Sequence, residues 1–122
     1  MAEYNVHITK YEHNKRFSNE LINKNDNYSD WQTVAIFYAA LHLVEAIFSK
    51  KYNEHTYKHS VRSAYMCEHY DVFSRNAMKC YNKLQNLSSK ARYTDIIKDD
   101  EDYYCAKEYL ENFEEEVIRF IE

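Results

Sequence analysis

The chain has 122 residues and contains neither glycine nor proline. Glycine supplies the positive φ angles of hairpin turns, and both residues mark the tight turns of β-rich and α/β domains. Their complete absence argues against an all-β or a parallel α/β fold. We therefore predict an all-α protein in which polar segments join the helices.

Cysteine is also scarce, with three residues and no C-x-x-C spacing. This usage indicates reduced thiols in a cytosolic protein, not a disulfide framework or a zinc site. The first ten residues lack the basic-then-apolar pattern of a signal peptide. The apolar stretch at residues 31–48 is interrupted by His42 and Glu45, and we expect it to be too short to span a bilayer. The expected location is cytoplasmic, with no membrane association.

Residues 31–48 are the most informative stretch and read WQTVAIFYAALHLVEAIF. At helical spacing, large side chains gather on one face and alanines on the neighbouring face. A helix that is apolar nearly all round belongs at the centre of a bundle, where each large buried side chain stabilises the fold by about 1.5–3 kcal/mol. The large-residue face comprises Trp31, Val34, Tyr38, Leu41, Glu45 and Phe48.

The remaining periodicity predicts an antiparallel four- to five-helix bundle that forms a single domain over residues 1–122. We expect helices at about residues 5–23, 57–70 and 73–91, and from 99 onward, beside the central one. Thr56 is the expected N-cap of the third helix. The last helix repeats apolar residues at alternating spacings of three and four, which is a bundle seam. That seam comprises Tyr103, Ala106, Leu110, Phe113, Val117 and Phe120.

The net charge of −4 is unevenly distributed along the chain. Residues 1–48 carry −2, residues 49–93 carry +6 and residues 94–122 carry −8. One interpretation is that the basic middle and the acidic last helix neutralise one another within the bundle. The other is that the middle third presents a phosphate-facing surface.

Three motifs carry a resemblance to a known family. They are DWQTVAIFYAALHLVEAIF at residues 30–48, HSVR at 59–62 and YNKLQNLSSKARY at 81–93. Together they resemble the HEPN-like helical-bundle family, over about two-thirds of the chain. The resemblance implies a helical bundle that often forms homodimers and acts in prokaryotic toxin–antitoxin, antiviral or RNA-processing systems. Many members are metal-independent endoribonucleases that use an arginine followed after four to six residues by a histidine.

The candidate residues for such chemistry lie in the second half of the chain. Arg92 aligns best with the family arginine, but no histidine stands at the expected distance beyond it. Arg62 and His69 match the spacing, with six residues between them. RNA cleavage without a metal needs a base for the 2′-hydroxyl proton and a cation for the phosphate, which suit histidine and arginine respectively. The alternative is that His69 only ends a helix and that Arg62 pairs with carboxylates of the last helix.

We expect phosphate contacts from four residues, which are His59, Arg62, Arg92 and Tyr93. Two functions are consistent with them. The first is a dimerising module that binds RNA, a nucleotide or an antitoxin-type protein partner. The alternative is a metal-independent endoribonuclease that uses Arg62 and His69. We expect no cofactor and no metal, because His42 should be a buried histidine bonded to Glu45 or a tyrosine.

Overall fold

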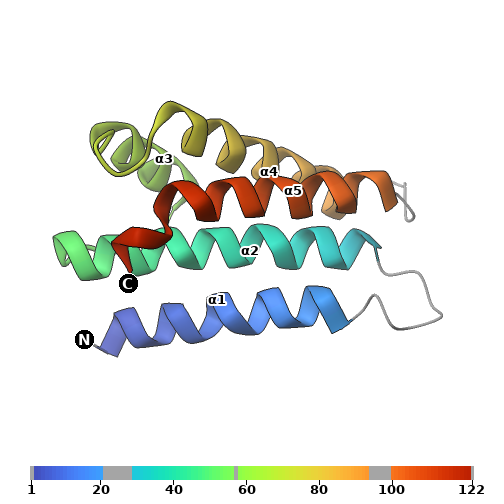
Figure 1. The fold of residues 1–122 in the computed structure, drawn as a ribbon, viewed down its shortest axis with the longest axis horizontal. Helices are drawn as coiled ribbons and strands as arrows, with labels where there is room; N and C mark the ends of the chain where they lie inside the picture. Colours follow the sequence, from blue (N-terminus) through green and yellow to red (C-terminus); the bar gives the residue numbers. More distant parts are fainter. Residues whose placement is uncertain (1, 21–28, 57, 94–99, 122) are drawn as a thin grey trace.

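The computed structural model describes residues 2–20, 29–56, 58–93 and 100–121, and all regular secondary structure in these ranges is helical (Figure 1). The predicted all-α fold is therefore confirmed. The elements are α1 (Ala2–Glu20), α2 (Ser29–Ile47), η2 (Phe48–Tyr52), α3 (His59–Glu68), α4 (Arg75–Tyr93), α5 (Asp100–Val117) and η3 (Ile118–Phe120).

Helix α2 is the centre of the bundle, as its composition predicts. It packs against α1 on one side and against α4 and α5 on the other (Figure 1). Its alanines allow close approach of the neighbouring backbones, while its large side chains provide the burial. The α2 side chains with no exposed surface are Phe37, Ala39, Ala40, Leu43, Val44, Ala46 and Ile47.

The first turn of α2 differs from the prediction. Trp31 is 57% exposed, whereas Gln32 and Thr33 are buried. Gln32 Nε2 donates a hydrogen bond of 2.9 Å to the carbonyl oxygen of Ser18 in α1. This bond turns the Gln32 side of the helix inward, and the indole of Trp31 consequently faces solvent.

Helix α2 runs directly into η2, a π-helical turn that continues the helical stretch to Tyr52. Residues 30–52 are long and apolar enough to cross a membrane by those two criteria alone, so the expectation that this stretch is too short was wrong. However, 89% of the apolar window is buried inside the protein. That burial is typical of the central helix of a bundle.

At the end of η2, an asparagine adopts the left-handed backbone conformation that usually favours glycine. Asn53 adopts the left-handed conformation, with φ of 51° and ψ of 41°, and its amide bonds the carbonyl oxygen of Phe48. Asparagine tolerates this conformation better than other non-glycine residues. The turn directs the chain away from α2 toward α3, and it places residues 54–56 beside the C-terminal half of α2.

Helix α3 begins later than expected, and Thr56 does not cap it. Lys58 occupies the N-cap position without a side-chain hydrogen bond. In α5 the predicted seam is buried from Tyr103 to Val117, and Phe120 packs against the core from η3. The three cysteines are free thiols, of which Cys80 is buried.

Candidate functional site

Glu45 is a buried carboxylate at the centre of a polar cluster. It lies in the C-terminal half of α2 and is 1% exposed. Oε1 accepts hydrogen bonds from Arg62 Nε at 2.8 Å and from the Thr56 hydroxyl. Oε2 accepts the Thr56 amide at 3.1 Å and lies 3.5 Å from His55 Nδ1. Buried charges need such partners, so the cluster fixes residues 55, 56 and 62 against α2.

Arg62 is buried as well, with 5% exposure. Its Nη1 lies 3.0 Å from Nδ1 of His59, one turn earlier in α3. The sequence analysis expected Arg62 either to face phosphate or to pair with the last helix. The structure corrects the second expectation, because the partner of Arg62 is Glu45 of the central helix.

Three histidines form a chain beside Glu45. His7 of α1 places Nδ1 2.9 Å from His42 Nδ1 and Nε2 3.1 Å from His55 Nδ1. Its ring stacks on both neighbours, with centroid distances of 5.1 Å and 4.9 Å. The expectation that His42 bonds Glu45 or a tyrosine was wrong. Glu45 bonds Thr56 and Arg62 on the α3 side of the bundle, and His42 contacts His7 of α1 instead.

His7 and His42 lie in an environment that disfavours their positively charged forms. Burial, with the neighbouring His55 next, lowers the pKa of His7. Burial, followed by the nearby His7 and Lys10, lowers the pKa of His42 to about 4. At neutral pH His42 is therefore uncharged, with one ring nitrogen available as an acceptor.

One ligand-type atom each from His7, Glu45 and His55 lies within 4.8 Å of the other two. No metal was expected from the sequence, because His42 was predicted to be a buried histidine bonded within the protein. The structure brings the donors together from α1, α2 and the segment after η2, so no local motif could show them. Nitrogen and carboxylate oxygen are both ligands that divalent transition metals accept.

A second group lies on the other side of Arg62. Arg92, near the end of α4, donates from Nη1 to the Tyr38 hydroxyl at 3.3 Å, and its guanidinium lies 6.0 Å from the Tyr38 ring centroid. Burial, followed by the positive charges of Arg62 and Arg92, lowers the pKa of His59. Of the four predicted phosphate contacts, His59 and Arg62 therefore contact each other directly, and the charge of Arg92 also acts on His59. The side chain of Tyr93 lies outside the described part of the structure.

A cavity of about 330 Å³ adjoins Arg92. It is lined by Arg92 and Ala91 from α4 and by Asp30, Trp31 and Val34 from α2. The exposed indole of Trp31 therefore shares a cavity with the guanidinium of Arg92. Trp31 was predicted to belong to the large-residue face of the central helix, so this exposed aromatic surface was not expected from the sequence.

His69, the predicted catalytic partner of Arg62, follows the last residue of α3. Its ring stacks on Tyr52 with a centroid distance of 3.9 Å, and it lies edge-on to Phe48. Its amide closes the helix by bonding the carbonyl oxygen of Tyr65. The described contacts of Arg62 and of His69 therefore involve different neighbours.

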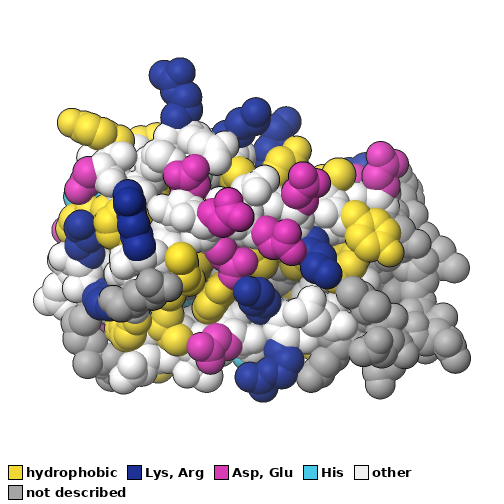
Figure 2. Space-filling model, viewed as in Figure 1, with side chains coloured by type: hydrophobic (Ala, Val, Ile, Leu, Met, Phe, Trp, Pro, Cys, Tyr) yellow, Lys and Arg dark blue, Asp and Glu magenta, His cyan; other side chains and the backbone are white. Residues whose placement is uncertain are grey.

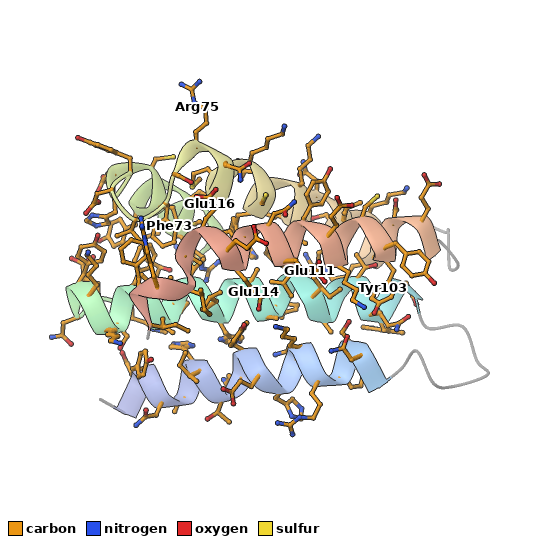
Figure 3. All side chains as sticks on the ribbon, viewed as in Figure 1. Phe73, Arg75, Tyr103, Glu111, Glu114 and Glu116 are labelled. Carbon is orange, nitrogen blue, oxygen red and sulfur yellow. The ribbon has the colours of Figure 1, made fainter. Side chains whose placement is uncertain are left out.

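The acidic last helix pairs mainly with α1 and α4. Glu114 bonds Lys15 at 2.7 Å, and Asp102 bonds Lys90 at 2.7 Å. On the face shown in Figure 2, acidic side chains gather over α5 with basic ones around them. Figure 3 shows Glu111, Glu114 and Glu116 along α5.

Comparison with known proteins does not assign this site. No family model matches the chain, and no curated protein or solved structure matches it. The site therefore has to be interpreted from its own geometry. The one sequence signal that could have located it is Glu45, because a carboxylate inside an apolar helix requires a cation from elsewhere in the chain.

Proposed function

We propose that this chain is a small helical module that binds the phosphates of RNA or of a nucleotide at the surface formed by His59, Arg92 and Tyr38. Two contacts and one electrostatic effect support the proposal. Arg92 of α4 donates to the Tyr38 hydroxyl of α2, Arg62 lies 3.0 Å from His59 of α3, and the positive charge of Arg92 helps to lower the pKa of His59.

The residue types suit a phosphodiester. The guanidinium of Arg92 carries the permanent positive charge that phosphate oxygens prefer, and the His59 ring can donate a hydrogen bond beside it. Trp31 lies in the cavity beside Arg92 and is exposed, so a base can stack on the indole. Arg62 is held by Glu45 and serves to orient His59 in this proposal.

The resemblance in sequence extends the proposal. The D-W, Y-A-A-L-H, H-x-x-R and A-R-Y motifs support an antiparallel HEPN-like bundle that dimerises and acts in prokaryotic defence or toxin–antitoxin systems. An antitoxin-type protein would then be a further partner. Sedimentation equilibrium tests the dimer, and a monomer at micromolar concentrations would contradict it.

Binding is a better supported function than cleavage. A metal-independent nuclease built on Arg62 and His69 requires both side chains at one phosphate. Arg62 is engaged by Glu45 and His59, and the His69 ring stacks on Tyr52. We therefore propose phosphate binding, and cleavage by this pair stays an alternative prediction.

The test is fluorescence anisotropy with a labelled single-stranded RNA at low and moderate salt. Arg92→Ala and His59→Ala should weaken binding, Arg92→Ala by roughly 10- to 150-fold, because a hydrogen bond to a charged group contributes about 1.5–3 kcal/mol. Arg92→Ala should also lower the slope of log affinity against log salt by about 0.7.

Arg75→Ala is the matched control, because Arg75 begins the same helix and points away from the bundle (Figure 3). Equal binding by the Arg92→Ala and Arg75→Ala proteins would contradict the proposal, as would no binding at low salt. The same RNA incubated in EDTA tests cleavage. A cyclic-phosphate product that His69→Ala abolishes would favour the nuclease alternative.

A further inference from the structure

The atoms that face one another at His7, Glu45 and His55 are arranged around a common point. His7 Nε2 is 3.1 Å from His55 Nδ1, and His55 Nδ1 is 3.5 Å from Glu45 Oε2. A fourth atom, Glu3 Oε2, lies 4.0 Å from the same nitrogen of His55. Glu3 and His7 are one turn apart in α1, so both can address this point.

A single hydrogen joins at most two of these atoms. It can lie between His7 Nε2 and His55 Nδ1 at 3.1 Å, while Oε2 of Glu45 accepts the Thr56 amide and Oε2 of Glu3, at 4.0 Å, is beyond hydrogen-bond distance. A divalent cation can take a lone pair from each nitrogen and from each oxygen, and its charge offsets that of the carboxylates.

The distances suit zinc. Zinc binds histidine nitrogen at about 2.0–2.1 Å and carboxylate oxygen at about 2.0–2.2 Å, so neighbouring ligands of a tetrahedral site lie about 3.3 Å apart. The separations of 3.1 Å and 3.5 Å lie on either side of that value. The donor atoms of His7 and Glu45 lie within 4.8 Å of each other, so side-chain rotation can bring all three donors around one ion.

Surrounding contacts orient the same atoms. The Nδ1 atom of His7 faces His42 Nδ1 at 2.9 Å, which directs Nε2 toward His55. Arg62 and the Thr56 hydroxyl bond Oε1 of Glu45, and the Thr56 amide bonds Oε2, which lies on the His55 side. Protein metal sites characteristically hold their ligands by such outer hydrogen bonds.

We propose that His7 Nε2, His55 Nδ1 and Glu45 Oε2 bind one divalent transition metal ion, with zinc the best fit and Glu3 within reach of the fourth position. This site is separate from the proposed phosphate contacts at His59 and Arg92. An ion there would join α1 to α2 and to the segment after η2.

The test is calorimetric titration of tag-free, chelator-treated protein with zinc chloride. We expect one zinc ion per chain and a rise in melting temperature of roughly 10 °C at a hundredfold excess over the dissociation constant. His7→Gln should weaken binding on the order of 100-fold or more. His13→Gln, an exposed histidine of the same helix, should bind as the parent does.

Cobalt provides a second measurement that does not depend on a variant. Co²⁺ added to the parent protein should give the intense visible bands of a four-coordinate site, and zinc should remove them. His55→Gln, in a non-helical segment, repeats the test if His7→Gln does not fold.

Three outcomes would overturn the proposal. These are less than one zinc per chain, equal binding by the His7→Gln and His13→Gln proteins, and a cobalt spectrum of the hexa-aqua ion. The RNA assay separates this inference from the proposed function. Arg92→Ala should retain zinc binding, and a folded His7→Gln protein should retain RNA binding.

Discussion

Glu45 and Glu114 are two carboxylates with similar partners in different surroundings. Each accepts a hydroxyl hydrogen bond and pairs with a cation from another helix, Glu45 with Thr56 and Arg62, and Glu114 with Tyr11 and Lys15. Glu45 is 1% exposed, whereas the side chains of Glu114 and Lys15 are 14% and 44% exposed.

The comparison shows that burial, more than the set of partners, decides the energetic weight of an ion pair. Water screens the Lys15–Glu114 pair, and such surface pairs contribute about 0–1 kcal/mol. The Glu45–Arg62 pair has little water to screen it, so losing one member leaves an uncompensated charge in the core. Three predictions test this difference.

The largest effect is expected at Glu45. Glu45→Gln should lower the free energy of unfolding by about 3–5 kcal/mol, because the charge of Arg62 then stays buried without a counter-charge. Urea denaturation measures the loss. Glu114→Gln is the matched control and should lose about 1 kcal/mol or less.

A double variant separates charge burial from lost packing. Glu45→Leu combined with Arg62→Met removes both charges and should be more stable than either single variant. A double variant no better than the singles would show that shape and the Thr56 contact matter more than the charges. A loss below about 1 kcal/mol in Glu45→Gln would remove the contrast with Glu114 altogether.

A smaller effect is expected from the partners of Glu114. Tyr11→Phe should lower the free energy of unfolding by about 1.5 kcal/mol, because Tyr11 is buried and its hydroxyl bonds a charged group. Lys15→Met should lose about 0–1 kcal/mol, and added salt should abolish that loss. Urea denaturation with and without salt measures both. A larger loss of unfolding free energy in Lys15→Met than in Tyr11→Phe would contradict this contrast between an exposed and a buried partner.

The smallest effect concerns Glu116, a third carboxylate of α5. Hydrogen bonds from Asn76 and Ser74 lower its pKa below the usual 4.5. A lowered pKa in the folded state contributes stability at pH values above 4.5 and loses it as the pH falls through the folded value. The stability gap between the parent and Glu116→Gln should therefore be widest near neutral pH and close in acid. A gap that widens in acid would contradict this assignment.

Much of the fold was predictable from local pattern. Residues 31–48 are apolar at nearly every helical position, so only a central place in a bundle can cover them. The seam of α5 was predictable for the same reason. The first turn of α2 was not, because the Gln32 bond to Ser18 comes from another helix and turns Trp31 outward.

The candidate site was predictable only in its residue types. His59, Arg62 and Arg92 were expected to act together, and the structure shows Arg62 in contact with His59 and Arg92 in contact with Tyr38. The partner of Arg62 could not be deduced from the sequence, because Glu45 of α2 and Asp102 of α5 each offer a carboxylate that could pair with it. The chain of His7, His42 and His55 was not foreseeable, because each residue comes from a different segment.

The sequence alone therefore determined that the chain is helical and that residues 31–48 form its centre. Helical periodicity and the lack of glycine and proline are local properties, and they require no knowledge of neighbouring segments. Tertiary structure decided which polar groups meet. A buried carboxylate takes the partner that geometry places within hydrogen-bond distance, and that distance is set by how α1, α2 and α3 pack.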